Sequence, residues 1–159
     1  MIEVEVQGIS LDLNNTPVLL LREREGRRVL PIWVGPFEAS SITYAVKGKA
    51  FERPLTIDVI KRIIDALGAK TERVTITGMK DSTYFATLLL SRENSLITID
   101  IRPSDAVAIA VHTRVPIFVE DELMNSQGRE IEQSEKDKLN ELKNWIQGTD
   151  PEKFGDFKL

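Results

Sequence analysis

The first third of the chain has the periodicity of β-strands separated by polar turns. Residues 2–13 (IEVEVQGISLDL) place apolar and polar side chains at alternate positions, which is typical of a strand with one buried face. Two further apolar runs, residues 17–24 and 28–34, are separated by the turn sequence Glu25-Gly26. The pattern predicts an antiparallel meander of three strands.

Three later segments have the periodicity of helices. Residues 36–47 begin with a proline and continue without a breaker, and residues 56–67 carry apolar side chains along one face. Residues 104–113 are apolar on nearly every side, which predicts a buried helix. Thr56 and Ser104 stand where N-caps are expected.

The remaining apolar runs predict strands at residues 71–78, 83–91, 96–102 and 116–119. The first three are separated by short polar turns and form a second antiparallel meander. A helix at residues 134–147 follows, with apolar side chains on one stripe. The sequence therefore predicts an α+β fold, in which three main helices pack on two antiparallel meanders and a fourth helix lies near the C-terminus.

Composition limits the classes of protein to which the chain can belong. Its 159 residues are 42% hydrophobic and 29% charged, as in an ordinary globular domain, and we assign residues 1–130 to one domain. The acidic residues 131–159 are expected to pack on that domain or to extend it. Because there is no cysteine, disulfides, thiolate zinc sites and iron–sulfur clusters are excluded. The single histidine, His112, lies late in an apolar helix and receives no functional role.

Charge and hydropathy indicate the surroundings in which the protein works. The net charge of −4 argues against a general attraction to nucleic acid, although residues 1–80 hold 12 bases and 10 acids and are net positive. No apolar run is long enough to cross a membrane, and the first residues lack the pattern of a signal peptide. We expect a cytoplasmic protein that does not bind membranes.

The densest group of candidate functional residues is DIRPSD, residues 100–105. Asp100 and Arg102 project from the same face of a strand, and Asp105 opens the following helix. Glu120, which follows the next strand, is a fourth candidate. Converging carboxylates suit Mg²⁺ or Mn²⁺, and an arginine beside them can hold a phosphate. The alternative is structural, because an acid in a first helical turn and an Arg–Asp ion pair are ordinary features of a strand–helix junction.

Two other helix starts and one hairpin carry weaker signals. The junction at Gly35 exposes backbone N–H groups that suit an anion, with Glu38 in the first turn, whereas Trp33 and Phe37 are interpreted as core residues rather than a stacking platform. In RPLTID (residues 53–58), capping explains the hydroxyl and the acid without any chemistry. The four arginines between residues 22 and 28 are interpreted as a solvated strand edge, since glutamates interrupt them.

Together these blocks resemble the bifunctional nuclease domain family. The resemblance runs through residues 2–122 and is carried by LPIWVGPFEA, RPLTID, ALGAKTERVTIT, IDIRPSDAVAIAV and VPIFVEDE. It implies a mixed α+β fold, an oligomer, and hydrolysis of both DNA and RNA with little sequence preference. The polar positions of the family fall here on Glu38, Arg53, Thr56, Asp58, Asp100, Arg102, Ser104, Asp105 and Glu120. The family's RPLTHD block has a histidine where this chain has Ile57, so that imidazole is absent.

These observations lead to a specific hypothesis and two rivals. As a nuclease, the chain would use Asp100, Arg102 and Asp105 in catalysis and a divalent metal held by Asp100, Asp105 and Glu120. Substrate contacts are expected from Arg53, Thr56, Ser104 and Glu38. One rival is a non-catalytic oligomeric binding module, in which the same residues form a structural junction and the apolar helix faces mediate self-association. For either function we expect a homodimer, formed by pairing of residues 2–13 across a two-fold axis. The other rival is a small-ligand sensor that binds anions at the helix starts.

Overall fold

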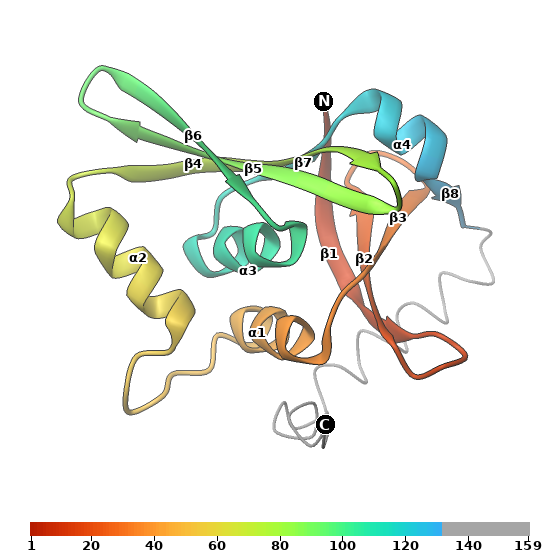
Figure 1. Ribbon diagram of the computed structural model, residues 1–159, viewed down its shortest axis with the longest axis horizontal. Coiled ribbons are helices and arrows are strands. Elements are labelled where there is room, and N and C mark those ends of the chain that lie inside the picture. Colours follow the sequence, from red (N-terminus) through yellow and green to blue (C-terminus); the bar gives the residue numbers. More distant parts are fainter. Residues whose placement is uncertain (132–159) are drawn as a thin grey trace.

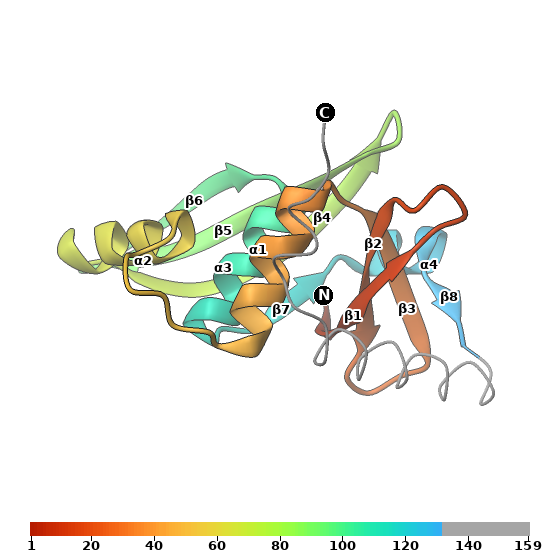
Figure 2. The same cartoon turned by 90° about the horizontal axis from the view of Figure 1, so that it is seen from below.

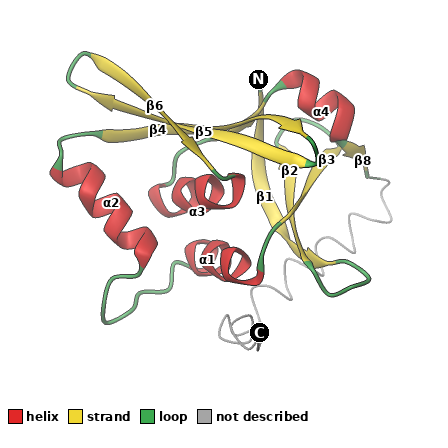
Figure 3. Ribbon diagram, viewed as in Figure 1, coloured by secondary structure: helices red, strands yellow, loops and turns green. Residues whose placement is uncertain are grey.

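A computed structural model describes residues 1–131, and these residues have the predicted α+β architecture (Figures 1 and 3). One eight-stranded sheet has the order β6-β5-β4-β7-β1-β2-β3-β8. The strands are β1 (Ile2–Leu11), β2 (Pro17–Glu23), β3 (Arg28–Trp33), β4 (Lys70–Lys80), β5 (Thr83–Arg92), β6 (Ser95–Ile101), β7 (Ile117–Val119) and β8 (Arg129–Glu130). The helices are α1 (Pro36–Lys47), α2 (Thr56–Ala66), α3 (Pro103–Thr113) and α4 (Asp121–Gln127).

Both predicted meanders are confirmed. Strands β1, β2 and β3 pair antiparallel in sequence order, as do β4, β5 and β6. Within β1 the register shifts between Val6 and Gly8, so the alternation changes phase there and both Gln7 and Ile9 are buried. The simple alternation predicted for residues 2–13 therefore holds only for the first half of the strand.

The short strand β7 joins the two meanders into one sheet. It pairs antiparallel with β1, where Val4 is opposite Ile117, and parallel with β4, where Val74 is opposite Ile117. β1 is therefore an internal strand that pairs with β2 on one side and β7 on the other. The expectation that residues 2–13 form an edge open to a second copy is wrong, because β6 and β8 are the edge strands.

Helices α1 and α3 run parallel to each other on one side of the β4-β5-β6 meander, with α3 between the sheet and α1 (Figures 1 and 2). Buried residues lie on every side of α3; they are Pro103, Ser104, Ala106, Val107, Ala108, Ile109 and Ala110. This confirms the prediction of a buried helix. The first turns of α1 and α3 meet at the end nearest β3, and their last turns face α2.

Two details of the helix starts differ from the prediction. Helix α3 begins at Pro103 with Arg102 as its N-cap residue, and Ser104 is a buried residue of the first turn rather than a cap. Helix α2 begins at Thr56 with Leu55 as its N-cap residue, and the backbone N–H of Leu55 donates to Asp58 Oδ2 at 2.7 Å. Pro103 has no backbone N–H that needs an acceptor at the start of α3. At the start of α2 the acceptor is the carboxylate of Asp58 and not the hydroxyl of Thr56.

The end of the described chain contains two elements that the sequence did not predict, namely α4 and β8. The predicted helix at residues 134–147 and the acidic segment 131–159 lie almost wholly outside the described residues. Within residues 1–131, no helix has the length and apolar character needed to cross a membrane.

Candidate functional site

A cleft of about 570 Å³ lies where the first turns of α1 and α3 meet the β4–β5 turn; we call it the junction cleft. The β3–α1 connection and the β6–α3 connection form two of its walls. The residues that line it are Ile32, Trp33, Val34, Gly35, Glu38, Ser82, Thr83, Tyr84, Arg102, Pro103 and Ser104. The Tyr84 hydroxyl donates to the backbone oxygen of Pro31 at 3.2 Å, which ties the start of β5 to β3 across the cleft.

Arg102 links the two helix starts through its guanidinium group. Nη1 donates to Glu38 Oε1 at 2.8 Å, while Nε and Nη2 donate to the two oxygens of Asp105 at 2.7 and 3.1 Å. The hydrogen bonds and charge of Asp105, with a smaller contribution from Glu38, raise the pKa of Arg102. The side chain is still 65% exposed, so it is a fixed and permanently charged donor at the surface.

Three of the predicted site residues line the junction cleft, namely Glu38, Arg102 and Ser104, and a fourth, Asp105, is bound to Arg102 beside it. Asp100 does not line the cleft; it is an exposed residue of β6 that pairs in register with Thr87 of β5. Both oxygens of Asp105 are turned to the guanidinium of Arg102, whose positive charge opposes a cation at that point.

Glu120 lies apart from this group. It follows β7, whereas Asp100 and Arg102 are at the end of β6, and strands β4 and β5 lie between. Three strand spacings separate the two ends, which is roughly 14 Å. In the described part of the chain, no three His, Asp or Glu side chains are grouped in a way that could hold a metal ion. The predicted ligand set of Asp100, Asp105 and Glu120 therefore does not fit a divalent cation.

Two aromatic side chains that were predicted to be core residues are exposed at the junction. Trp33 is 55% exposed at the end of β3, and Phe37 is 63% exposed in the first turn of α1. The indole Nε1–H of Trp33 donates to Asp12 Oδ2 at 3.0 Å, which fixes the ring. The interpretation of these residues as core was wrong. The alternative, a stacking platform, is consistent with where they lie.

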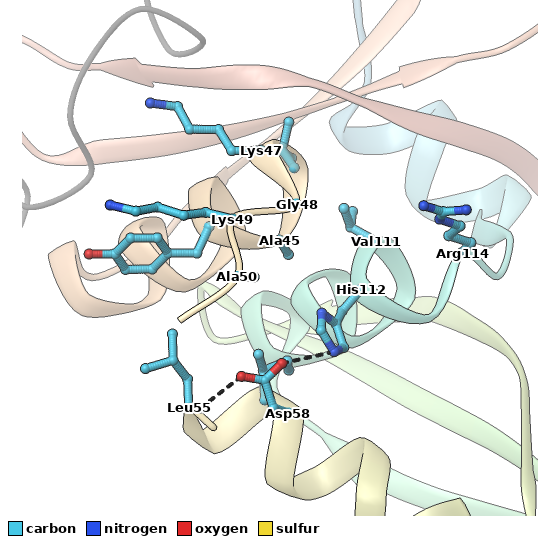
Figure 4. A pocket seen from close by; sticks show the side chains of 13 residues that line it. Ala45, Lys47, Gly48, Lys49, Ala50, Leu55, Asp58, Val111, His112 and Arg114 are labelled. Carbon is cyan, nitrogen blue, oxygen red and sulfur yellow. Dashed lines mark hydrogen bonds and ion pairs between the residues drawn. The ribbon is translucent and has the colours of Figure 1, made fainter. Parts of the chain in front are cut away.

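A second cleft, of about 550 Å³, lies at the opposite ends of α1 and α3, and we call it the histidine cleft (Figure 4). Its lining residues are Tyr44, Ala45, Val46, Lys47, Gly48, Lys49, Ala50, Leu55, Ile57, Asp58, Val111, His112 and Arg114. His112 Nε2 lies 3.2 Å from Asp58 Oδ1. Arg53 and Thr56 are exposed beside this cleft, at the start of α2, and are not part of the junction cleft.

The sequence did not predict the pairing of His112 with Asp58, because only acids nearby in sequence were considered as partners of the histidine. Asp58 is on another helix and meets His112 only when α2 packs against the end of α3. One signal was present, since both residues lie in the turns that begin or end their helices, where elements of a packed domain meet.

The arginine-rich hairpin is largely occupied in internal ion pairs. Arg24 Nη1 donates to Glu3 Oε1 at 2.7 Å, and Arg28 Nε donates to the buried Glu23 at 2.9 Å. Arg28 also donates to Asn125 of α4. These contacts agree with the structural interpretation of the segment.

The chain is similar to known proteins along most of its length. An uncharacterized protein of Mycobacterium tuberculosis (strain CDC 1551) is 38% identical over 162 residues, which cover 96% of this chain and 97% of that protein. Bifunctional nuclease 1 of Arabidopsis thaliana is 32% identical over 124 residues, covering 76% of this chain and 38% of that protein. Bifunctional nuclease 2 of Oryza sativa subsp. japonica is 35% identical over 116 residues, covering 70% of this chain and 36% of that protein. The match thus spans little more than a third of either plant nuclease.

The family comparison covers most of the described structure. The bifunctional nuclease domain matches residues 19–132, a range that includes both clefts, all three main helices, most of β2 and every strand from β3 to β8. With this match and relatives above 30% identity, the chain belongs to the bifunctional nuclease domain family.

Proposed function

We propose that this chain is a nuclease that hydrolyses phosphodiester bonds of DNA and RNA, and that its substrate binds at the junction cleft. One observation carries the proposal. The segments LPIWVGPFEA and IDIRPSD, which are far apart in the sequence, meet in this cleft through the contact of Arg102 with Glu38. A family resemblance and a surface recess therefore coincide.

The chemistry of the cleft suits one strand of a nucleic acid. Arg102 offers a fixed positive charge to a backbone phosphate, and its two carboxylate partners position it before the substrate arrives. Trp33 presents an exposed ring at the cleft, and Phe37 presents another in the first turn of α1; bases can stack on such rings. Stacking of this kind is tolerant of sequence because every base has an aromatic face. Limited sequence preference follows from such an arrangement.

A strand that is already unpaired presents its bases to these rings at no cost in unpairing energy. We therefore expect single-stranded DNA and RNA to be cut faster than duplexes. Because the predicted ligand set does not fit a cation, no step of the proposed reaction is assigned to a metal ion.

The proposal is tested with protein purified from a nuclease-deficient host and labelled single-stranded and duplex oligonucleotides of both DNA and RNA. The wild-type chain should cut the single strands, and Trp33→Ala should weaken their binding by about tenfold or more. Leu96→Ala is the control, because Leu96 is also an exposed apolar residue but lines neither cleft. Absence of cleavage by the wild type on every substrate, with and without Mg²⁺ or Mn²⁺, would refute the nuclease.

A second candidate, a non-catalytic assembly module, has one specific observation in its favour. Val59, Ile63 and Leu67 recur every fourth residue along α2 and its C-cap, and all three are exposed. Edge strand β6 adds the exposed Leu96. An apolar stripe beside an open strand edge is typical of a surface for self-association.

Gel filtration with light scattering tests this candidate. A module should give a stable oligomer that Ile63→Glu dissociates, whereas Asp65→Asn on the same helix should leave it intact. A monomeric wild type at all concentrations would eliminate self-association through α2. An oligomer that also cuts nucleic acid would be compatible with the nuclease, so the two assays are read together.

A further inference from the structure

The junction cleft lacks a side chain suited to moving protons during hydrolysis. Both oxygens of Asp105 accept from Arg102, and Glu38 is also bound to that guanidinium. Hydrolysis of a phosphodiester requires a group that removes a proton from water and a group that supplies one to the leaving oxygen. A side chain suited to proton transfer, the imidazole of His112, lies at the other end of the α1–α3 pair.

We propose that the histidine cleft is the reaction centre of the nuclease and that His112 is its general base, oriented by Asp58. This inference rests on the proposed function, because it assigns the chemical step of that activity. Among the described residues, the histidine cleft is where an imidazole, a carboxylate and several cations face one recess.

The Asp58 carboxylate is held in place from two sides. Its Oδ2 accepts the backbone N–H of Leu55 at 2.7 Å, and its Oδ1 lies 3.2 Å from Nε2 of His112. A carboxylate in this position favours the tautomer with the proton on Nε2, which leaves the lone pair on Nδ1. In Figure 4 the second ring nitrogen of His112 points away from Asp58, toward the end of α1. The imidazole and the carboxylate are each a little over one quarter exposed, so both are reachable from the cleft.

The cleft is also electropositive. Lys47, Lys49 and Arg114 line it together with His112, and Asp58 is its single acidic side chain. Favourable interaction of cations with helix C-termini explains Lys47 and His112 individually, because each stands in the last turn of its helix. It does not explain why Lys49, Arg114 and an α2 carboxylate line the same recess of about 550 Å³. A phosphate group carries a negative charge that suits such a lining.

The proposed step needs no reactant other than water. A water oxygen attacks phosphorus and forms a new P–O bond, while the proton lost by the water passes to Nδ1 of His112. The P–O bond to the sugar oxygen of the leaving strand then breaks on the opposite side of phosphorus, and that oxygen takes a proton from solvent water, while the imidazolium gives its proton back to the solvent. His112 returns to its neutral form, and the cations stabilise the charge on the phosphoryl oxygens in between.

The two clefts are close enough for one strand to occupy both. Ser104 in the first turn of α3 lines the junction cleft, and His112 in the last turn lines the histidine cleft. Eight residues of helix separate them, which is about 12 Å. A short single strand can therefore stack at Trp33, contact Arg102, and reach His112 with a phosphate a few nucleotides away.

The test compares single-turnover cleavage by the wild-type chain, His112→Gln, His112→Ala and Asp58→Asn. We expect His112→Gln to lose at least about a hundredfold in rate at saturating substrate, with half-saturation little changed. Asp58→Asn should lose about tenfold or more. Asp65→Asn is the matched control, because it makes the same change on the same helix at a residue paired with Lys61 and outside the cleft. Added imidazole should restore activity to His112→Ala, which a purely structural role would not allow.

A second measurement does not depend on activity. Because His112 is the only histidine in the chain, its imidazole proton signals in NMR report this cleft alone. Titration with inorganic phosphate should shift them saturably in the wild type, and Lys49→Glu should abolish the shift. Signals that do not move would contradict a phosphate site here.

The possible failures are distinguishable. If the wild type cuts nucleic acid and His112→Gln cuts equally fast, the inference is wrong and the proposed nuclease stands. If the wild type cuts nothing, the nuclease itself is wrong, and the assignment of His112 to its chemical step falls with it.

Discussion

The guanidinium of Arg102 donates to Glu38 at 2.8 Å and thereby ties the first turn of α3 to the first turn of α1. The position of Glu38 depends in turn on Gly35, because a Cβ atom on Gly35 would overlap the Glu38 carboxylate. The glycine allows the carboxylate to fold back over the helix start, toward Arg102.

We therefore expect Gly35→Ala to displace the Glu38 carboxylate and to leave Arg102 with Asp105 as its main partner. Since the displaced group is the end of a flexible side chain, the loss of stability should be small, within about 1 kcal/mol. Affinity for single-stranded oligonucleotides should fall several-fold. Fluorescence anisotropy and thermal melting measure the two effects, and equal affinity in the two proteins would show that Glu38 does not position Arg102.

The buried ion pair between Glu23 and Arg28 predicts a pH dependence of stability. Burial of the Glu23 carboxylate opposes its ionisation, but hydrogen bonds from the Arg28 side chain and backbone outweigh this effect and lower the pKa of Glu23. Because the pKa is lower in the folded state, the pair stabilises the fold fully above the unfolded value of about 4.5. This contribution is lost as the pH falls through the folded value.

Replacing Glu23 by alanine removes the partner of Arg28, which is itself partly exposed, and should cost about 1.5 kcal/mol at neutral pH. Urea unfolding at pH 7 and at successively lower pH measures this cost. The difference between wild type and variant should shrink in acid. A difference that stays constant down to pH 3 would mean that the pair does not have the assigned linkage.

Divalent cations should not stabilise the free protein at Asp105. The Arg102 guanidinium already occupies both carboxylate oxygens, so Mn²⁺ has no favourable position there. We expect the melting temperature in millimolar Mn²⁺ to equal that in EDTA within about 1 °C, since a bound ligand would raise it. A melting temperature that Mn²⁺ raises in the wild type but not in Asp105→Asn would show that Asp105 does bind the metal ion.

Binding of a nucleic-acid strand at the junction cleft should change the fluorescence of Trp33. The sequence holds two tryptophans, Trp33 and Trp145, so a Trp145→Phe variant isolates the signal of the exposed indole. Stacking of a base on that ring should quench it, and Asp12→Ala should reduce the quenching by releasing the indole from its hydrogen bond. A signal that an oligonucleotide leaves unchanged would place the substrate elsewhere.

Local sequence patterns were sufficient for the individual elements of this fold. Residues 36–47 were predicted as a helix with the boundaries that α1 has, because a proline starts it and Gly48 ends it in the left-handed region. The two meanders followed from strand periodicity and short polar turns. The joining of the meanders could not be predicted in this way, since it depends on β7, a three-residue strand that pairs with β1 at the start of the chain and with β4 near its middle.

The same limit applies to the candidate site. The convergence of Glu38, Arg102, Ser104 and Asp105 could be anticipated in part, because Arg102, Ser104 and Asp105 are neighbours in sequence. Glu38 joined them through the parallel packing of α1 and α3. The exposure of Trp33 and the pairing of His112 with Asp58 depend on tertiary packing, on which a local pattern carries no information. A large aromatic at a strand end and a lone histidine are both more common in structural roles.

Single-turnover cleavage of one labelled single strand by the wild type, Arg102→Ala and His112→Gln tests the central claim most directly. The account predicts cleavage by the wild type, about tenfold weaker half-saturation for Arg102→Ala with a similar maximal rate, and a maximal rate reduced at least about a hundredfold for His112→Gln. The separation of the two effects would place substrate binding and chemistry at opposite ends of α1 and α3. An inactive wild type, or variants that cut with wild-type kinetics, would contradict the account.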